Sequence, residues 1–409
     1  MTLSRRAAIA NGMAVLAMAP GLARAATDAR ALHKKLICMD THLDMPANLA
    51  RPGWNVMDRH DVDLDFTQVD YPRMVEGGLD GGFFSIYTPQ APVTPEGMSA
   101  MRDAAFLRAA EIREMVVAHP QQFELAFVPE DAARIAAKGK IIVFQSIENS
   151  GILGNDVTLL RSFYKLGVRM AGPIHFLNNQ LGDSATDKKQ WGGLSPLGKD
   201  FVKEANDLGI VLDASHSSDD VFDQMMDLSR TAIICSHSGC RAIHDHPRNL
   251  DDARIKRLAA AGSTIQINSY NEYLVTVPPN PDRDKARRAA FGKMRNLGSM
   301  PPDQAAAAMR AVAAEMKAVD KQYPIPRADF EEYMKHVMHA LDLVGPDHVG
   351  VGADWDGGGG VTGMNDVTSI PKITERLVKA GYTEAQLSNF WSGNALRVLG
   401  KAHEARRQA

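Results

Sequence analysis

The sequence places a histidine and an aspartate two residues apart at the end of a short apolar run. The run is ICMDTHLDM (37–45), and the pair is His42 and Asp44. In an extended strand, side chains at i and i+2 share a face, about 6.5–7 Å apart along the chain. The two side chains could therefore hold one metal ion between them. The same triplet is also typical of a strand that ends in a polar turn, so it does not decide the matter alone.

Several other apolar runs end in a residue type that binds metals. These residues are Glu148 (QSIENS), His175 (AGPIHF), His216 (LDASHSS), His237 (IICSHSG) and Asp354 (VGADWDG). Each one alone is explained as a hydrogen-bonding turn residue, but so many ionisable groups at strand ends would be costly to bury unpaired. Imidazole and carboxylate without thiolate suit zinc or a neighbouring divalent metal in an open catalytic site. Four histidines and three carboxylates suffice for two metals that share a bridging carboxylate.

The elements that must position these residues alternate between short strands and amphipathic helices. This alternation predicts a parallel α/β fold, and eight strands predict a closed (β/α)8 TIM-type barrel. In such a barrel the active site lies at the carboxyl ends of the strands, where the residues above are found. The candidate strands are 36–42, 79–87, 141–147, 168–174, 209–215, 232–236, 263–269 and 348–353.

The structural alternative is a doubly wound open sheet. That fold usually has a glycine-rich turn after its first strand, and the sequence has none there. The run GGGG at 357–360 follows the last strand, but it lacks the spacing of a phosphate-binding loop. We interpret it as a flexible loop.

One segment interrupts the alternation of strands and helices. Residues 275–330 insert a Pro- and Arg-rich loop and a helix after the seventh strand. This position predicts a segment over the barrel mouth, acting as a lid or as a dimer surface. A peripheral insertion without a catalytic part is the alternative.

Two further histidine pairs have spacings that metals use. His244 and His246 lie in a polar stretch followed by a proline, which predicts a loop rather than a ligand pair. His336 and His339 lie three apart on a predicted amphipathic helix. Because that helix should pack outside the barrel, we expect a solvated or a core role for both.

Charge composition and cysteine content argue against a nucleic-acid-binding protein and against a disulfide-rich protein. The 409 residues carry a net charge of −3, with 46 Lys and Arg against 49 Asp and Glu. This balance gives no basic field for nucleic acid or anionic lipid, so a small-molecule partner is expected. The three cysteines, Cys38, Cys235 and Cys240, form no C-x-x-C motif. We therefore expect no disulfide framework, no thiolate metal site and no lipid anchor.

The first 25 residues have the features of an export signal. Arg5 and Arg6 precede an Ala- and Met-rich run, and Ala23-Arg24-Ala25 resembles a cleavage site. The run is too short and too weakly apolar to span a membrane. The adjacent arginines resemble the twin-arginine signal. We expect export to the periplasm and a single barrel domain over residues 26–409.

The order of the motifs makes the chain resemble a known family. DTHLD, QSIEN, DASHSS, CSHSG, HPRNLDD and HVGVGADWDG resemble, in this order, the signatures of the membrane dipeptidase (renal dipeptidase) family of zinc hydrolases. The likeness extends from about Leu36 to WSGNALRVLG near the C-terminus. It implies a metal-dependent (β/α)8 barrel that cleaves dipeptides with two zinc ions per chain.

The resemblance also implies a role for each motif residue. His42 and Asp44 would bind one zinc, His216 and His237 the other, and Glu148 would bridge them. The remaining roles concern the substrate. His175 would contact the scissile group, Arg248 would bind the substrate carboxylate, and Asp354 would contact the catalytic water or the substrate amine. Arg248 has an alternative role in a salt bridge to Asp251 or Asp252.

The function that follows is hydrolysis of a dipeptide by a metal-bridging hydroxide. The same residues are compatible with another amide or lactam hydrolase, acting on D-amino acid derivatives or β-lactams, with a phosphoesterase, or with a non-catalytic periplasmic metal-binding protein. The expected partners are a dipeptide or similar small amide and a second copy of the chain in a homodimer. Nucleic acid and a membrane span are not expected.

The role of Asp40 stays open between two possibilities: it could orient His42, or it could line the barrel floor.

Overall fold

The computed structural model describes residues 28–407, and their parallel strands form the predicted barrel. The predicted export signal lies outside the described residues. All eight expected strands are present, and each is buried along its whole length. They are β1 (Met39–Leu43), β2 (Gly81–Ile86), β4 (Ile141–Ile147), β5 (Val168–Ala171), β6 (Val211–Leu212), β7 (Ile234–Cys240), β9 (Thr264–Ile267) and β10 (Val349–Val351). Two short strands were not predicted, β3 (Phe123–Leu125) beside β4 and β8 (Asn249–Leu250) beside β7.

The barrel consists of two sheets that meet at two seams. One sheet has the order β1-β2-β4-β5-β6 and the other the order β10-β9-β7-β8. At the first seam, between β6 and β7, Asp213 pairs with Ile234; at the second, between β1 and β10, Leu43 pairs with Trp355. Each seam therefore closes through a single parallel bridge.

A buried aspartate reinforces each seam. Asp213 Oδ1 accepts a hydrogen bond from the backbone N–H of Ser236 on β7 (2.9 Å). Asp40 Oδ2 accepts one from Ala353 N–H after β10 (3.0 Å), and its Oδ1 accepts one from His42 N–H (2.9 Å). Asp40 therefore joins β1 to the chain after β10 and holds the backbone of His42 rather than its ring, which differs from both predicted roles.

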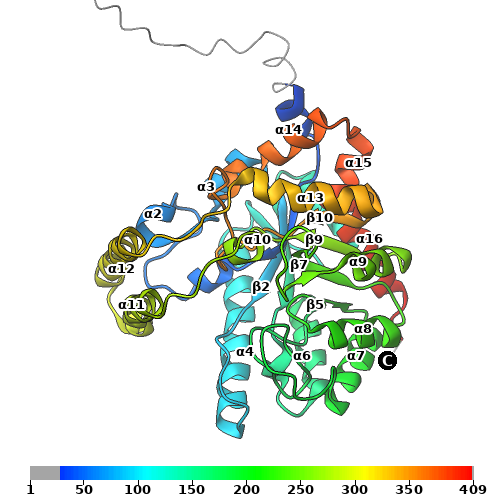
Figure 1. The fold of residues 1–409 in the computed structure, drawn as a ribbon, viewed down its shortest axis with the longest axis horizontal. Coiled ribbons are helices and arrows are strands. Elements are labelled where there is room, and N and C mark those ends of the chain that lie inside the picture. The colour runs from blue at the N-terminus through cyan, green and yellow to red at the C-terminus, as the bar shows by residue number, and fades with distance from the viewer. Residues whose placement is uncertain (1–27, 408–409) are drawn as a thin grey trace, which may run out of the picture.

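Helices surround the barrel and connect its strands (Figure 1). Many begin at a residue whose side chain accepts a hydrogen bond from the first turn, such as Ser195, Ser218 and Asp251. The connecting helices are α2 (Val62–Asp65), α3 (Tyr71–Gly77), α4 (Pro95–Ala118), α5 (Pro129–Ala136), α6 (Leu160–Leu166), α7 (Pro196–Leu208), α8 (Asp219–Leu228), α9 (Asp252–Ala260), α10 (Asn271–Leu274), α13 (Phe330–Val344), α14 (Pro371–Lys379), α15 (Glu384–Ser388) and α16 (Asn394–Glu404).

The predicted insertion contains two long helices at one side of the barrel. They are α11 (Pro281–Gly292) and α12 (Pro302–Gln322), drawn at the left of Figure 1. Phe66, which follows α2, packs into two small apolar clusters, one with Val312 and Met316 and the other with Leu297 and Met309. The insertion after β9 is therefore attached to the segment that follows β1.

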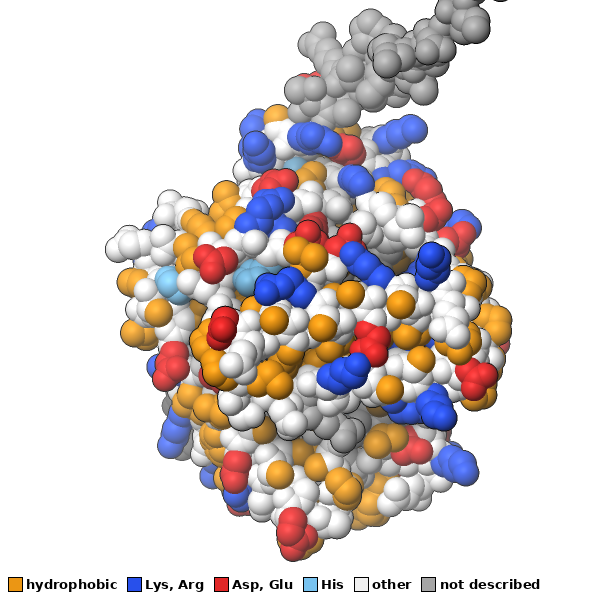
Figure 2. Space-filling model, turned by 90° about the vertical axis from the view of Figure 1, so that its left-hand side faces the viewer, with side chains coloured by type: hydrophobic (Ala, Val, Ile, Leu, Met, Phe, Trp, Pro, Cys, Tyr) orange, Lys and Arg blue, Asp and Glu red, His pale blue; other side chains and the backbone are white. Residues whose placement is uncertain are grey.

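The surface of the described part carries mixed charges. On the face where α11 and α12 lie, Lys and Arg side chains are interspersed with Asp and Glu side chains (Figure 2). Within residues 28–407 no helix combines the length and the apolar character needed to cross a membrane. Cys38, Cys235 and Cys240 are all buried as free thiols.

Candidate metal centre

The side chains predicted from the strand ends meet around one carboxylate, Glu148. Glu148 follows β4, and its Oε1 lies 3.1 Å from His216 Nε2 and 3.3 Å from His175 Nε2. The same oxygen lies 3.5 Å from His42 Nε2 and 3.6 Å from His237 Nε2. Four imidazoles from four different strands therefore direct Nε2 towards one oxygen atom.

Two aspartates complete the group on the side of His42. Asp44 Oδ2 lies 3.3 Å from His42 Nε2, and Asp354 Oδ1 lies 3.9 Å from the same nitrogen. On the other side, His216 Nε2 and His237 Nε2 are 2.8 Å apart. The predicted pairs, His42 with Asp44 and His216 with His237, thus flank Glu148.

The backbone is strained at two of these residues. His216 has a φ of 66° and Asp354 a φ of 67°, in the left-handed region that favours glycine. Each follows a strand end in a turn that directs its side chain to the barrel axis. Such strain is typical of functional sites, where the surrounding structure holds residues in unfavourable conformations.

A hydrogen-bonded chain orients the ring of His237. Ser236 Oγ donates to Asp213 Oδ2 (2.5 Å), so it can only accept from His237 Nδ1, which lies 2.8 Å away. The proton of His237 therefore resides on Nδ1, and the lone pair of Nε2 is directed at Glu148. Such a partner fixes the tautomer that a metal-binding histidine needs.

Burial controls the protonation of the group. Burial, assisted by the positive charge of Arg248, lowers the pKa of His216 well below its ordinary value, and burial also lowers the pKa of His237 well below its own. Burial and the charge of Asp44 raise the pKa of Glu148 well above its ordinary range. Against the effect of burial, the carboxylates of Asp44 and Glu148 raise the pKa of His42. Since metals bind neutral imidazole, His216 and His237 are in the required state.

The donor atoms fit divalent metal ions. Three triplets bring one donor atom each within 4.8 Å of one another: His42, Glu148 and His237; Glu148, His175 and His216; and His42, Asp44 and Asp354. Asp44 Oδ1 and Glu148 Oε2 are buried and have no hydrogen-bond partner among residues 28–407. A set of nitrogen and carboxylate oxygen donors, with oxygen atoms left unpaired, suits zinc or a similar cation.

Arg248 lies beside this group and is buried. Its Nη2 donates to the backbone oxygen of His237 (3.0 Å), and its guanidinium lies 5.0 Å from the ring centre of Tyr273. The alternative role is not realised: among the described residues Arg248 has no carboxylate partner, while Asp251 pairs with Arg254 and Asp252 with His339. Its Nε is buried and has no hydrogen-bond partner within the described part of the chain. The guanidinium is therefore available to a carboxylate ligand.

The glycine run after β10 is closely packed, which corrects its interpretation as a flexible loop. A Cβ atom added to Gly357 would lie 2.1 Å from Asp44 Oδ2 and 2.2 Å from Asp354 Oδ1. A Cβ on Gly359 would lie 1.9 Å from Ala353 O. Gly357 leaves no room for a side chain because its backbone passes directly against the two carboxylates, and Gly359 leaves none because it passes against the backbone at Ala353.

The other histidine pairs have separate roles. His336 is buried and accepts a hydrogen bond from Cys240 N–H at Nδ1 (3.0 Å), while His339 pairs with Asp252 (2.8 Å). His246 accepts from Arg248 N–H (3.1 Å) in the loop between β7 and β8. None of these residues belongs to the triplets of donor atoms found in the described part of the chain.

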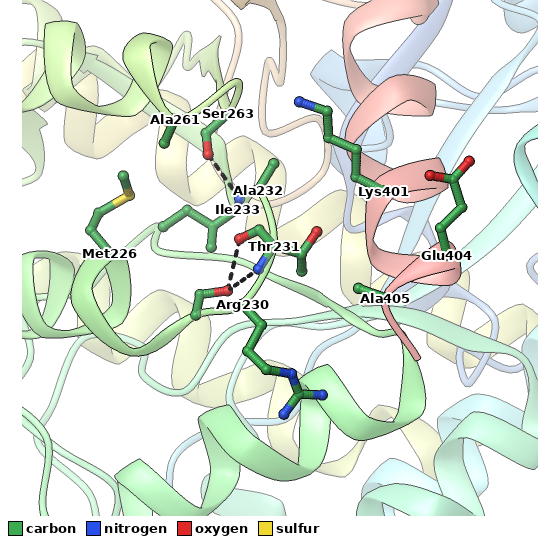
Figure 3. Close-up of a pocket in the computed structure, with 11 residues that line it drawn as sticks. Met226, Arg230, Thr231, Ala232, Ile233, Ala261, Ser263, Lys401, Glu404 and Ala405 are labelled. Carbon is green, nitrogen blue, oxygen red and sulfur yellow. Dashed lines mark hydrogen bonds between the residues drawn. The ribbon is translucent and has the colours of Figure 1, made fainter. Parts of the chain in front are cut away.

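A cleft of about 550 Å³ lies at the opposite end of the barrel (Figure 3). Its lining residues include Arg230 and Ser263, which precede β7 and β9, and Lys401 and Glu404 of α16. The cleft is therefore at the amino ends of the strands, whereas the metal centre is at their carboxyl ends. It contains none of the predicted site residues.

Sequence reasoning missed the residues that support the site. Asp213 lies three residues before His216 in LDASH, and Ser236 directly precedes His237 in CSH, so their position at strand ends was a usable signal. Asn268, whose Nδ2 donates to Asp354 Oδ2 (3.3 Å), follows the seventh strand, which had no ionisable residue. Tyr273 had no recognisable signal.

Comparison with known proteins identifies the family. The family model described as membrane dipeptidase (peptidase family M19) matches residues 26–409. Dipeptidase tcpJ of Claviceps purpurea (strain 20.1) is 27% identical over 346 residues, which cover 82% of this chain and 69% of the relative. The crystal structure of the probable dipeptidase PvdM from Pseudomonas aeruginosa is 28% identical with a TM-score of 0.79, over 94% of this chain and 99% of that chain.

A more distant structure shares the fold. A metallo peptidase from Rhodobacter sphaeroides, liganded with a phosphinate mimic of the dipeptide L-Ala-D-Ala, is 23% identical with a TM-score of 0.69, over 90% of this chain and 99% of that chain. The family match over almost the whole chain confirms the resemblance seen in the motifs, and with it the assignment as a metal-dependent hydrolase. The chain belongs to the membrane dipeptidase family, peptidase family M19.

Proposed function

We propose that the protein is an exported dipeptidase that uses two zinc ions. The observation that carries this proposal is the convergence of four imidazoles on Glu148 Oε1, with Asp44 and Asp354 on one side. His42 and Asp44 would hold one ion, His216 and His237 the other, and Glu148 would lie between them. Zinc in such a site supplies Lewis acidity and lowers the pKa of water to near neutrality. Residues 1–25 support export to the periplasm.

Three residues of the chain would act on the substrate. Arg248 would bind its free carboxylate, because the guanidinium is buried without a carboxylate partner in the described structure. Burial lowers the pKa of His175 to about 3, so its ring is neutral and can donate a hydrogen bond to the oxygen of the scissile carbonyl. Burial raises the pKa of Asp354 to about 6, which suits a group that takes a proton and passes it to the leaving amine.

The decisive experiment compares substrates on protein of known metal content. We expect hydrolysis of dipeptides from a library with L,L and L,D members, loss of that activity on chelation and its recovery with zinc. A β-lactam and a phosphoester are included because two-metal sites also cleave other bonds. Full activity in metal-free protein, or no dipeptide hydrolysis by the zinc-loaded protein, would overturn the proposal.

The role of Arg248 is tested by comparing a dipeptide that has a free C-terminal carboxylate with its C-terminal amide. A hydrogen bond to a charged group contributes about 1.5–3 kcal/mol, so the C-terminal amide should have a kcat/KM about 10- to 100-fold below that of the free dipeptide. Arg248→Ala should remove most of this difference. Equal kcat/KM values for acid and amide in the wild type would exclude the assigned role.

A further inference from the structure

The insertion places an arginine without an ionic partner in a cleft beside the metal centre. The cleft has a volume of about 390 Å³, and Arg287 of α11 lines it together with Tyr270 and Gly358. We propose that Arg287 binds an acidic side chain of the substrate, so that the enzyme prefers dipeptides that contain aspartate or glutamate. The inference rests on the proposed dipeptidase function and goes beyond it by naming the substrate class.

The wall of this cleft includes the backbone that packs against the metal-centre carboxylates. Gly358 lines the cleft, and its neighbour Gly357 lies directly against Asp44 and Asp354. Because consecutive Cα atoms are about 3.8 Å apart, one residue of backbone separates the cleft from these carboxylates. A second cleft of about 770 Å³ shares Gly358 and continues along residues 359–360. The glycine run therefore faces open space on the side of the insertion.

Tyr270 connects the same cleft to the residue proposed to bind the substrate carboxylate. A Cβ atom added to Gly358 would lie 2.5 Å from the Tyr270 ring, so the ring packs against the glycine run. The centroid of Tyr270 lies 4.6 Å from that of Tyr273, whose ring centre lies 5.0 Å from the Arg248 guanidinium. The cleft therefore adjoins the substrate-binding region on two sides, next to Asp354 and next to Arg248.

Arg287 is the basic residue of this cleft that lacks an acidic partner. The other three basic residues each pair with an aspartate of the same cleft: Arg283 and Arg327 with Asp320, and Lys317 with Asp63. Among the described side chains none forms an ion pair with Arg287, and its Nε is buried without a hydrogen-bond partner there. Leaving a buried donor unpaired costs free energy, which a carboxylate that accepts from the guanidinium would offset.

One acidic residue of the cleft, Glu272 of α10, is unpaired as well. Among the described side chains it forms no ion pair with Arg287 or with another basic residue, although it lines the same cleft. Its negative charge opposes an acidic ligand and should reduce the preference. The lining side chains nevertheless carry a net charge of +1, because four basic residues face three acidic ones. Arg287 and Glu272 should therefore have opposite effects on an acidic substrate.

The test compares kcat/KM for Ala-Glu with Ala-Gln and for Asp-Ala with Asn-Ala, in whichever configuration the enzyme accepts, on metal-quantified protein. Ala-Ala is the neutral reference. We expect the wild type to prefer the acidic peptide in at least one pair, and Arg287→Gln to lower that acidic-to-amide ratio about tenfold. Arg287→Lys should retain part of the preference, and Glu272→Gln should increase it. Arg288→Gln is the matched control: it removes the same charge from the next residue of α11, which is exposed and does not line this cleft, and it should leave the ratio unchanged.

Three results would overturn the inference. A wild type that hydrolyses Ala-Ala but prefers the acidic peptide in neither pair would exclude this specificity and leave the proposed function intact. An unchanged ratio in Arg287→Gln, or an equal fall in Arg288→Gln, would show that Arg287 does not bind the acidic side chain. A zinc-loaded wild type that hydrolyses none of the dipeptides would overturn the proposed function, and this specificity with it.

Discussion

Removing the hydroxyl of Ser236 should weaken metal binding although Ser236 is not a ligand. In Ser236→Ala, His237 Nδ1 loses the acceptor at 2.8 Å that fixes its tautomer. Asp213 Oδ1 still accepts hydrogen bonds from the backbone N–H groups of Ser215 and residue 236, so the seam between β6 and β7 remains intact. Loss of such a partner typically costs 10- to 100-fold in metal affinity, equivalent to about 1.4–2.7 kcal/mol.

Ser238→Ala is the matched control on the other side of His237. Both serines are buried, but Ser238 Oγ has no hydrogen-bond partner in the described structure, so its removal breaks no such contact. Zinc affinity is measured by competition with a chelator, alongside thermal unfolding to check the fold. Equal effects of the two substitutions, or an unchanged affinity in Ser236→Ala, would refute the assigned orientation of His237.

Other perturbations separate the parts of the site. His216→Ala should lower zinc content and turnover together, while Asp354→Asn should retain the metal and lose kcat; retained zinc in the first variant would contradict its role as a ligand. Gly357→Ala should abolish most activity, because its Cβ would displace the carboxylates of the site, whereas Gly292→Ala, with nothing within 4 Å, should be neutral. Burial raises the pKa of Asp80 to about 6, so the folded state keeps a proton that the unfolded chain releases near pH 4. The contribution of Asp80 to the free energy of unfolding should therefore fall as pH rises from about 4 to 6, and denaturant unfolding of Asp80→Asn should show a shallower fall over this range than the wild type.

The barrel and its ligand-bearing strand ends were predictable because burial imposes simple patterns. Fully buried parallel strands are nearly continuous apolar runs, such as IIVFQSI before Glu148, and they could be recognised without the structure. Strands β3 (FEL) and β8 (NL) were missed because each includes a polar residue and neither forms a continuous apolar run.

The supporting contacts could not be predicted because they join residues far apart in the chain. Asp40 reaches Ala353 across the second seam, and Asn268 reaches Asp354 from the neighbouring strand. A position next to His237 marks both Ser236 and Ser238 in the sequence, and the structure is needed to show that Ser236 is the one that orients the ring. The packing of Gly357 against two carboxylates likewise depends on where the chain returns after β10.

Because the metal centre draws its residues from both sides of the two seams, metal binding should depend on how firmly the barrel is closed. His42, Asp44, Glu148, His175 and His216 belong to the half of the barrel that runs from β1 to the first seam, whereas His237 and Asp354 belong to the other half. Metal ions bound by residues of both halves would hold the halves together, because within residues 28–407 the backbone contributes one bridge at each seam. Amide exchange at Ala214 and Asp44, which donate across the two seams, would then slow when metal is added. A substitution that weakens either seam far from the site would then lower the metal content before it unfolds the protein.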